Sequence, residues 1–179
     1  MKTHEENAPT SNLFFSNKSF KTHFLMIQKE QNSWAWVQAR LTVSRASVWK
    51  ALTQPEYTVR YMYDCELHAH FTPGGEAVWR SKNEAGIWED HVRAEVLKYD
   101  PMKCLTFKIF HRETSQHKAA FSELHFILEK RRKELILQIK QGDFSKIEDG
   151  IQRQQECQKG WEYILPDLIK TCERIEKIP

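Results

Sequence analysis

Histidine side chains are the residues of this chain best suited to acid–base or metal chemistry. His68 and His70 stand two positions apart in an alternating segment, so they share one face of a predicted strand. Three more histidines fall in other predicted strands: His91, His111 and His125. A histidine pair at this spacing can supply two metal ligands, but no cysteine or carboxylate stands where it would complete a tetrahedral site. We interpret these histidines as solvent-facing groups on the outside of a sheet, and we predict neither a metal nor a cofactor.

Carboxylates on the predicted strands are the candidates for a general base. They are Glu66, Glu89, Asp90, Glu95 and Glu123. A general base must reach its substrate inside a pocket, whereas most carboxylates on strands face solvent. The chain has no Gly-x-Ser-x-Gly motif, no phosphate-binding loop and no recognisable cysteine–histidine pair. We therefore predict no catalytic residue and keep enzymatic activity as an alternative.

Aromatic residues offer a different kind of site, an apolar pocket. Rings on strands and helices can line a pocket for a flat or apolar ligand. They can equally fill the core, where one ring contributes about 2–3 kcal/mol of apolar burial. Both interpretations stay open for each ring. The predicted cavity residues are Tyr61, Phe71, Trp79, Trp88, Phe107, Phe126, Trp161 and Leu165.

The helix that carries Trp161 is predicted from an apolar stripe near the end of the chain, and we expect it to begin near Asp149. Pro166 interrupts the stripe, cannot donate a backbone hydrogen bond to Glu162, and costs about 3 kcal/mol inside a helix. We predict a kink near Ile164–Pro166, or a break there into two helical pieces. The stripe recurs at steps of three and four residues: Cys157, Trp161, Ile164, Leu165, Leu168, Cys172 and Ile175.

Alternating segments predict the sheet against which this helix packs. Residues 35–43 alternate apolar and polar side chains. Ser44 is a predicted N-cap for a short helix, and Pro55 suits the first turn of a second one. Further strands are predicted at 65–71, 76–82, 87–99, 104–111, 121–130 and 134–141, the third of them with a bulge. This order indicates an α+β fold, in which a curved antiparallel sheet of about six to seven strands wraps around a long C-terminal helix.

The bulk properties of the chain narrow the remaining choices. Residues 1–32 are polar and irregular, so we expect a mobile extension of a single domain at 33–179, although 24–27 could add an edge strand or a short helix. The net charge of +3 comes from interleaved charges, which argues against nucleic-acid binding. Four cysteines without metal-binding spacing predict buried free thiols in a reducing compartment. No apolar run or signal sequence indicates a membrane span or secretion, and we expect a cytoplasmic protein.

Four motifs resemble the helix-grip fold of the START-like (SRPBCC) superfamily and, within it, the activator of heat shock protein 90 ATPase homologue family. The resemblance covers about 33–173 and implies a deep pocket between sheet and helix, in which relatives hold small apolar or aromatic molecules. Some members of the superfamily are enzymes and others are co-chaperones. The chaperone-activating eukaryotic proteins also carry a separate N-terminal domain, for which this chain has no room. The motifs are Val48–Glu56, Phe71–Gly75, Val96–Leu105, and Gly160-Trp161 with Leu165 and Leu168.

Three functions follow as hypotheses. The leading one is the binding of a small hydrophobic or aromatic molecule in the cavity. The first alternative is a cyclase- or hydrolase-like enzyme that uses the same pocket, which requires a buried titratable side chain facing the cavity. The second is a protein-interaction module, including a co-chaperone with a chaperone partner, which requires an exposed apolar patch. The sequence indicates no particular oligomeric state.

Overall fold

The computed structural model describes residues 33–111, 120–132 and 134–178. Its strands form one antiparallel sheet in the order β1-β7-β6-β5-β4-β3-β2. The strands from β2 to β7 follow one another as a meander, and β1 joins β7 at one edge. The bounds are β1 (Ala35–Leu41), β2 (Glu66–Ala69), β3 (Glu76–Lys82), β4 (Trp88–Asp100), β5 (Cys104–His111), β6 (Ala120–Arg131) and β7 (Glu134–Gly142).

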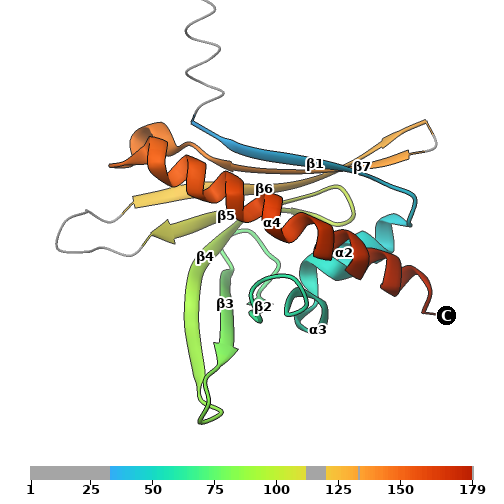
Figure 1. Cartoon of the computed structure of the whole chain (residues 1–179), viewed down its shortest axis with the longest axis horizontal. Coiled ribbons are helices and arrows are strands. Elements are labelled where there is room, and N and C mark those ends of the chain that lie inside the picture. Colours follow the sequence, from blue (N-terminus) through green and yellow to red (C-terminus); the bar gives the residue numbers. More distant parts are fainter. Residues whose placement is uncertain (1–32, 112–119, 133, 179) are drawn as a thin grey trace, which may run out of the picture. The chain divides into compact units, whose positions relative to one another are not determined.

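The helices lie where the change of period predicted them. Two short helices, α2 (Arg45–Thr53) and α3 (Pro55–Thr58), connect β1 to β2, and the long helix α4 (Gly150–Glu176) closes the chain after the short turn η1 (Phe144–Lys146). In Figure 1, α4 runs across one face of the curved sheet. The predicted α+β helix-grip architecture is confirmed. The predicted extension at 1–32, with its cluster at 24–27, lies outside the described residues.

Alternation along the strands decides which side chains face α4. In β1, buried residues alternate strictly with exposed ones, and in β6 buried residues alternate with half-buried ones. The inward side chains of the sheet and the apolar stripe of α4 form one continuous core. The sheet therefore has one apolar face, which packs on α4, and one solvated face, as is common for antiparallel sheets.

The long strand β4 is bulged, as predicted. Opposite β5, its pairing skips Leu97 between Val96 and Lys98. Opposite β3, the pairing skips His91 between Asp90 and Val92. Each bulge adds one residue to β4 and increases the local twist, which bends the sheet around the helix.

The predicted cap and first-turn residues of the short helices are confirmed. The Ser44 side chain accepts a hydrogen bond from the backbone N–H of Ser47, and Pro55 stands in the first turn of α3. Val48 and Leu52, at 0% and 1% exposure, anchor α2 in the core.

Helix α4 passes through Pro166 without a break, so the predicted division into two helical pieces is wrong. Pro166 itself is exposed, and on either side of it Ile164 and Leu168 are 4% and 0% exposed. Burial of these neighbours holds the helix against the sheet although Glu162 cannot receive a backbone hydrogen bond from residue 166. A kink near Ile164–Pro166 stays a prediction. The helix begins at Gly150, directly after Asp149, as expected.

Side-chain amides of α4 bind the free edge of β1. Gln158 accepts a hydrogen bond from the Trp36 backbone N–H at 2.7 Å and donates to the Trp36 carbonyl at 3.1 Å. One turn earlier, Gln154 donates to the Trp34 carbonyl at 3.1 Å. Backbone groups that a further strand would otherwise pair are therefore satisfied by the helix.

The other end of α4 is tied to the start of α2. The Glu176 carboxylate accepts hydrogen bonds from the Ser47 hydroxyl at 2.6 Å, the Ser44 hydroxyl at 2.7 Å and the Ser44 backbone N–H at 2.9 Å. The hydrogen bonds from Ser47 and Ser44 lower the pKa of Glu176. A carboxylate is also favourable near a helix N-terminus. The contact closes a chain loop of more than a hundred residues.

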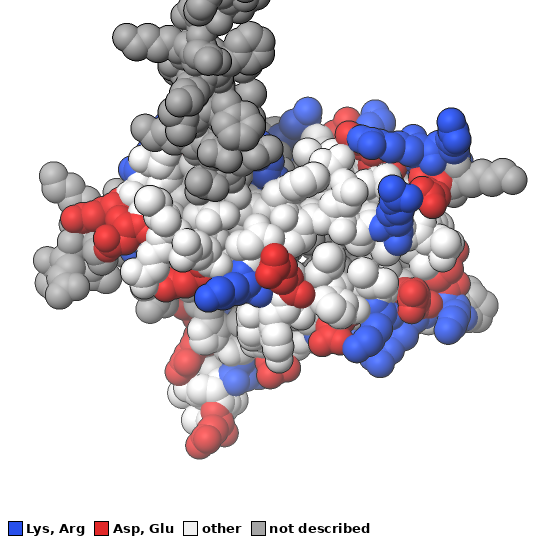
Figure 2. Space-filling view, turned by 45° about the horizontal axis from the view of Figure 1, so that its top comes forward, with Lys and Arg blue, Asp and Glu red and all other residues white. Residues whose placement is uncertain are grey.

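The remaining features of the described residues concern surface and thiols. All four cysteines are free. No helix among 33–111, 120–132 and 134–178 is long and apolar enough to cross a membrane. The same residues contain no group of three or more His, Cys, Asp or Glu side chains that could hold a metal ion. Figure 2 shows acidic and basic side chains interspersed on the face in view.

We expect Glu176→Gln to lower the melting temperature at neutral pH, because an amide replaces the carboxylate that accepts three hydrogen bonds. The folded pKa of Glu176 lies below its usual value, so its contribution to stability is present above about pH 4.3 and is lost as the pH falls through the folded pKa. The difference between wild type and variant should therefore shrink in acid, as measured by circular dichroism. Glu173→Gln, at an exposed position of the same helix, is the control. Equal melting temperatures of wild type and Glu176→Gln at neutral pH would contradict the assignment.

Candidate functional site

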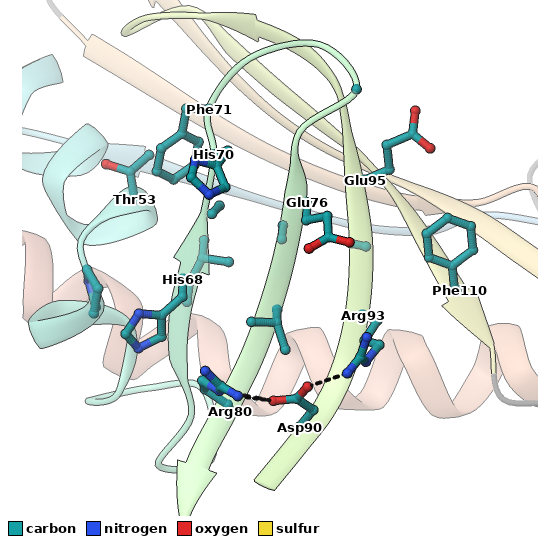
Figure 3. A pocket seen from close by; sticks show the side chains of 17 residues that line it. Thr53, His68, His70, Phe71, Glu76, Arg80, Asp90, Arg93, Glu95 and Phe110 are labelled. Atoms are coloured by element: carbon teal, nitrogen blue, oxygen red, sulfur yellow. Dashed lines mark hydrogen bonds and ion pairs between the residues drawn. The ribbon is translucent and has the colours of Figure 1, made fainter. Parts of the chain in front are cut away.

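One hollow lies on the outer face of the sheet, over β2, β3 and β4, and has a volume of about 910 Å³. Figure 3 shows it with α4 behind the strands. Its floor is charged, since Asp90 binds Arg80 at 2.7 Å and Arg93 at 2.8 Å. His70 and Glu76 point into the same space. This hollow is lined by several charged side chains, unlike the apolar pocket that the sequence predicts.

The second hollow, the inner cavity, lies between the inward face of the sheet and α4 and has a volume of about 290 Å³. Ligand pockets begin at about 300 Å³, so the inner cavity suits a small molecule. The wall is formed by the strands from β3 to β7, by α4 and by the segment between α3 and β2. The lining residues are Met62, Trp79, His91, Val92, Ile109, Phe110, His111, Leu124, Gln141 and Trp161.

A row of aromatic rings runs beside the inner cavity, from β3 to α4. The Trp79 and Phe107 ring centroids are 5.1 Å apart, Phe107 and Phe126 are 6.5 Å apart, and Phe126 and Trp161 are 5.7 Å apart. All three contacts are edge-to-face, which is a favourable geometry for aromatic pairs. Trp79 and Trp161 line the inner cavity, whereas Phe107 and Phe126 fill the core between them.

The other predicted cavity residues lie elsewhere. Tyr61 is buried and donates its hydroxyl to the Ala51 carbonyl at 3.0 Å. Phe71 stacks on Tyr99 at 5.2 Å, and Leu165 is half-buried against the core. Trp88 is 36% exposed on the outer face, where Lys82 lies over its ring. Of the predicted set, the structure therefore brings Trp79 and Trp161 together at the inner cavity.

A chain of hydrogen bonds forms the polar end of the inner cavity. The Gln141 side-chain oxygen accepts from the Trp161 indole N–H at 2.9 Å and from the Cys157 thiol at 3.2 Å. Its nitrogen donates to the Ser122 hydroxyl at 3.2 Å, and Ser122 is 3.0 Å from His111 Nε2. Burial raises the pKa of the Cys157 thiol to about 12, so it is protonated at neutral pH.

His111 is the titratable group of this polar end. Burial lowers its pKa, and the nearby positive charge of Arg153 lowers it further, so the ring is neutral at neutral pH. The interpretation of the strand histidines as solvent-facing is therefore wrong for His111, which ends β5 on the inward side. It holds for His70, which is exposed. His91 is also exposed but lines the inner cavity.

The polar residues that sequence analysis missed interrupt the apolar alternation of their strands. His111 follows Phe107 and Ile109 in the inward positions of β5. Ser122 precedes Leu124 on β6, and Gln141 follows the inward residues of β7. Each is a polar residue where the alternation calls for an apolar one, and all three lie at the same end of the sheet. Three such breaks in neighbouring strands predict a buried polar cluster.

The sequence matches the family model described as activator of Hsp90 ATPase homolog 1-like protein over residues 42–173. The chain belongs to this family. The match begins directly after β1 and ends in the last turn of α4, and it confirms the resemblance inferred from the motifs. No curated protein matches the sequence significantly.

Solved structures share the fold of this family member. Protein MLL2253 from Mesorhizobium loti has 18% identity and a TM-score of 0.64, with 79% of this chain and 97% of that chain covered. Protein NE0264 from Nitrosomonas europaea has 13% identity and a TM-score of 0.62, with 80% and 96% covered. CalU16 from Micromonospora echinospora has 19% identity and a TM-score of 0.57, with 79% and 80% covered. At these identities the likeness concerns the fold alone.

We expect Trp161→Phe to lower the free energy of unfolding by about 0.5–1.5 kcal/mol, because it removes one of the two hydrogen bonds to the half-buried Gln141 oxygen. The measurement is a urea titration of both proteins. Trp88→Phe, the same change on the outer face, should cost no more than about 0.5 kcal/mol. Similar losses in the two variants would show that the Trp161 hydrogen bond contributes little.

Proposed function

We propose that this family member binds a small apolar or aromatic molecule in the inner cavity, with Trp79 and Trp161 in contact with it. The observation that carries the proposal is the lining of the inner cavity, where apolar side chains meet the polar groups of Gln141 and His111. The buried apolar residues of this lining are Trp79, Ile109, Leu124 and Trp161, and the exposed ones that complete it are His91 and Phe110. The family and fold support it, since they are those of SRPBCC ligand-binding or polyketide cyclase/aromatase-like proteins. Free thiols and the lack of a spanning helix in the described residues fit the expected cytoplasmic site of action.

The size of the inner cavity limits the ligand to about one or two rings. A ligand that buries about 150 Å² of apolar surface gains roughly 4 kcal/mol from that burial, at about 25 cal/mol per Å². Immobilising the ligand opposes part of this gain. We therefore expect single-ring compounds to bind weakly and to serve as probes for a larger natural ligand.

Catalysis in the same cavity receives less support. A base there would need a free lone pair, and the histidines that line the inner cavity are His91 and His111. The Nε2 atom of His111 lies 3.0 Å from the Ser122 hydroxyl, and that of His91 lies 2.7 Å from the Ser81 hydroxyl, so each ring has one nitrogen in a hydrogen bond. Binding is therefore the function that the geometry supports best.

The protein-interaction alternative depends on the outer face. Phe110 and Phe121 are paired across β5 and β6 and are 44% and 49% exposed. Lys108 lies over the Phe121 ring at 4.5 Å, so the pair is partly covered by a charge. A chaperone partner stays a hypothesis for this surface.

A thermal-shift screen of apolar and aromatic compounds, followed by native mass spectrometry, tests the proposal. A compound present at a hundred times its Kd stabilises the folded chain by about 2.7 kcal/mol, which corresponds to a rise in melting temperature of roughly 5–10 °C. We expect Val92→Phe, which fills the inner cavity, to abolish the rise. Ile127→Phe, a half-buried position that does not line the cavity, should retain it. A screen without any stabilising compound, or an equal rise in Val92→Phe, would contradict the proposal.

A further inference from the structure

The orientation of the Gln141 amide is fixed by its partners. The Trp161 indole nitrogen is a donor only, and it lies 2.9 Å from one end of the amide. That end must be the oxygen, because the amide nitrogen would place two N–H groups against each other. The amide nitrogen therefore points to Ser122, 3.2 Å away, and donates one of its two hydrogens there.

The direction of the next hydrogen bond follows from the first. Ser122 is 1% exposed and already accepts from Gln141. Its own hydrogen has no acceptor among the described residues other than His111 Nε2, 3.0 Å away. A neutral imidazole that accepts at Nε2 carries its proton on Nδ1. The low pKa of His111, caused by burial and by Arg153, agrees with a neutral ring.

The polar end of the inner cavity therefore has N–H groups left over and no accessible lone pair. Both acceptor sites of the Gln141 oxygen are used by Trp161 and Cys157. The second hydrogen on the Gln141 nitrogen and the hydrogen on His111 Nδ1 have no acceptor in residues 33–111, 120–132 and 134–178. Gln141 and His111 both line the inner cavity. A ligand with the matching acceptor takes the place of water at these half-buried N–H groups, whereas a ligand without one leaves them unpaired.

We propose that the ligand of the inner cavity is an apolar molecule that carries a carbonyl-type oxygen, and that the Gln141 amide donates a hydrogen bond to this oxygen. The inference rests on the proposed function, since it concerns the same cavity. The positive charge of Arg153, close enough to act on His111, also favours an electron-rich oxygen over a donor or a cation. Ligands whose only polar group is an N–H are rejected, because they place donor against donor.

Three single-ring probes test the ligand class. Acetophenone carries the carbonyl oxygen, N-methylaniline is of similar size and carries an N–H instead, and cumene carries no polar group. We expect acetophenone to bind the wild-type chain roughly 3- to 10-fold more tightly than N-methylaniline, because a satisfied hydrogen bond replaces a donor–donor contact. The measurement is an NMR titration that also follows the side-chain amide signals of the glutamines. The Gln141 signals should move with acetophenone.

The substitution Gln141→Glu should reverse the preference for acetophenone over N-methylaniline. In Gln141→Glu the carboxylate still accepts from Trp161, but it offers an acceptor instead of a donor to the inner cavity. N-methylaniline should then bind more tightly than acetophenone, while cumene binds as before. Gln138→Glu makes the same change on the same strand at a position that does not line the cavity, and it should keep the wild-type preference.

The outcomes separate the two proposals. If cumene and both other probes fail to bind the wild-type chain, the proposed function fails. If cumene binds but N-methylaniline binds as tightly as acetophenone, the assignment of donors is overturned and the proposed function stands. The wild-type preference alone decides this, so the test does not depend on the folding of Gln141→Glu.

Discussion

One helix must cover the inward face of a seven-stranded sheet, and the structure depends on how firmly that helix is held. The apolar contacts of Trp161, Leu168 and Ile175 with the sheet supply the main attraction. Polar contacts fix its position along and across the strands. Gln158 binds β1 near the start of the helix, and Glu176 binds the N-terminus of α2 at its end. With both ends fixed, the exposed Pro166 in the middle does not divide the helix.

The same arrangement explains why a cavity remains where it does. Along β5, β6 and β7 the inward positions are apolar until the strands reach the end nearest the start of α4. There the sequence places His111, Ser122 and Gln141, which cannot pack as tightly as aliphatic side chains and need partners. Trp161 serves both sides of this boundary, since its ring packs on Phe126 and its N–H binds Gln141. The inner cavity thus has mainly apolar side chains along its wall and hydrogen-bonding groups at one end.

The fold could be predicted almost completely from local patterns, because each of its elements has a strong period. Alternation in β1, β6 and β7 and the stripe of α4 identify the core directly. The site was less predictable, because a list of aromatic residues does not say which side of the sheet each one faces. A bulge at His91 and a shorter β2 decide that Trp79 faces α4 and that Trp88 faces outward. The break at Pro166 was wrongly predicted because local cost was considered without the burial of Ile164 and Leu168. His111 was misread because its residue type was given more weight than its inward place in the alternation.

The amide contacts of α4 with β1 have a further consequence for the behaviour of the protein at high concentration. A sheet edge with unpaired backbone groups is a template for another chain, and such edges cause aggregation. Here Gln158 occupies both backbone groups of Trp36 that a foreign strand would need, and Gln154 occupies the carbonyl of Trp34. The opposite edge is β2, which is only four residues long. The helix that borders the inner cavity thus also blocks the start of the first strand from pairing with another chain.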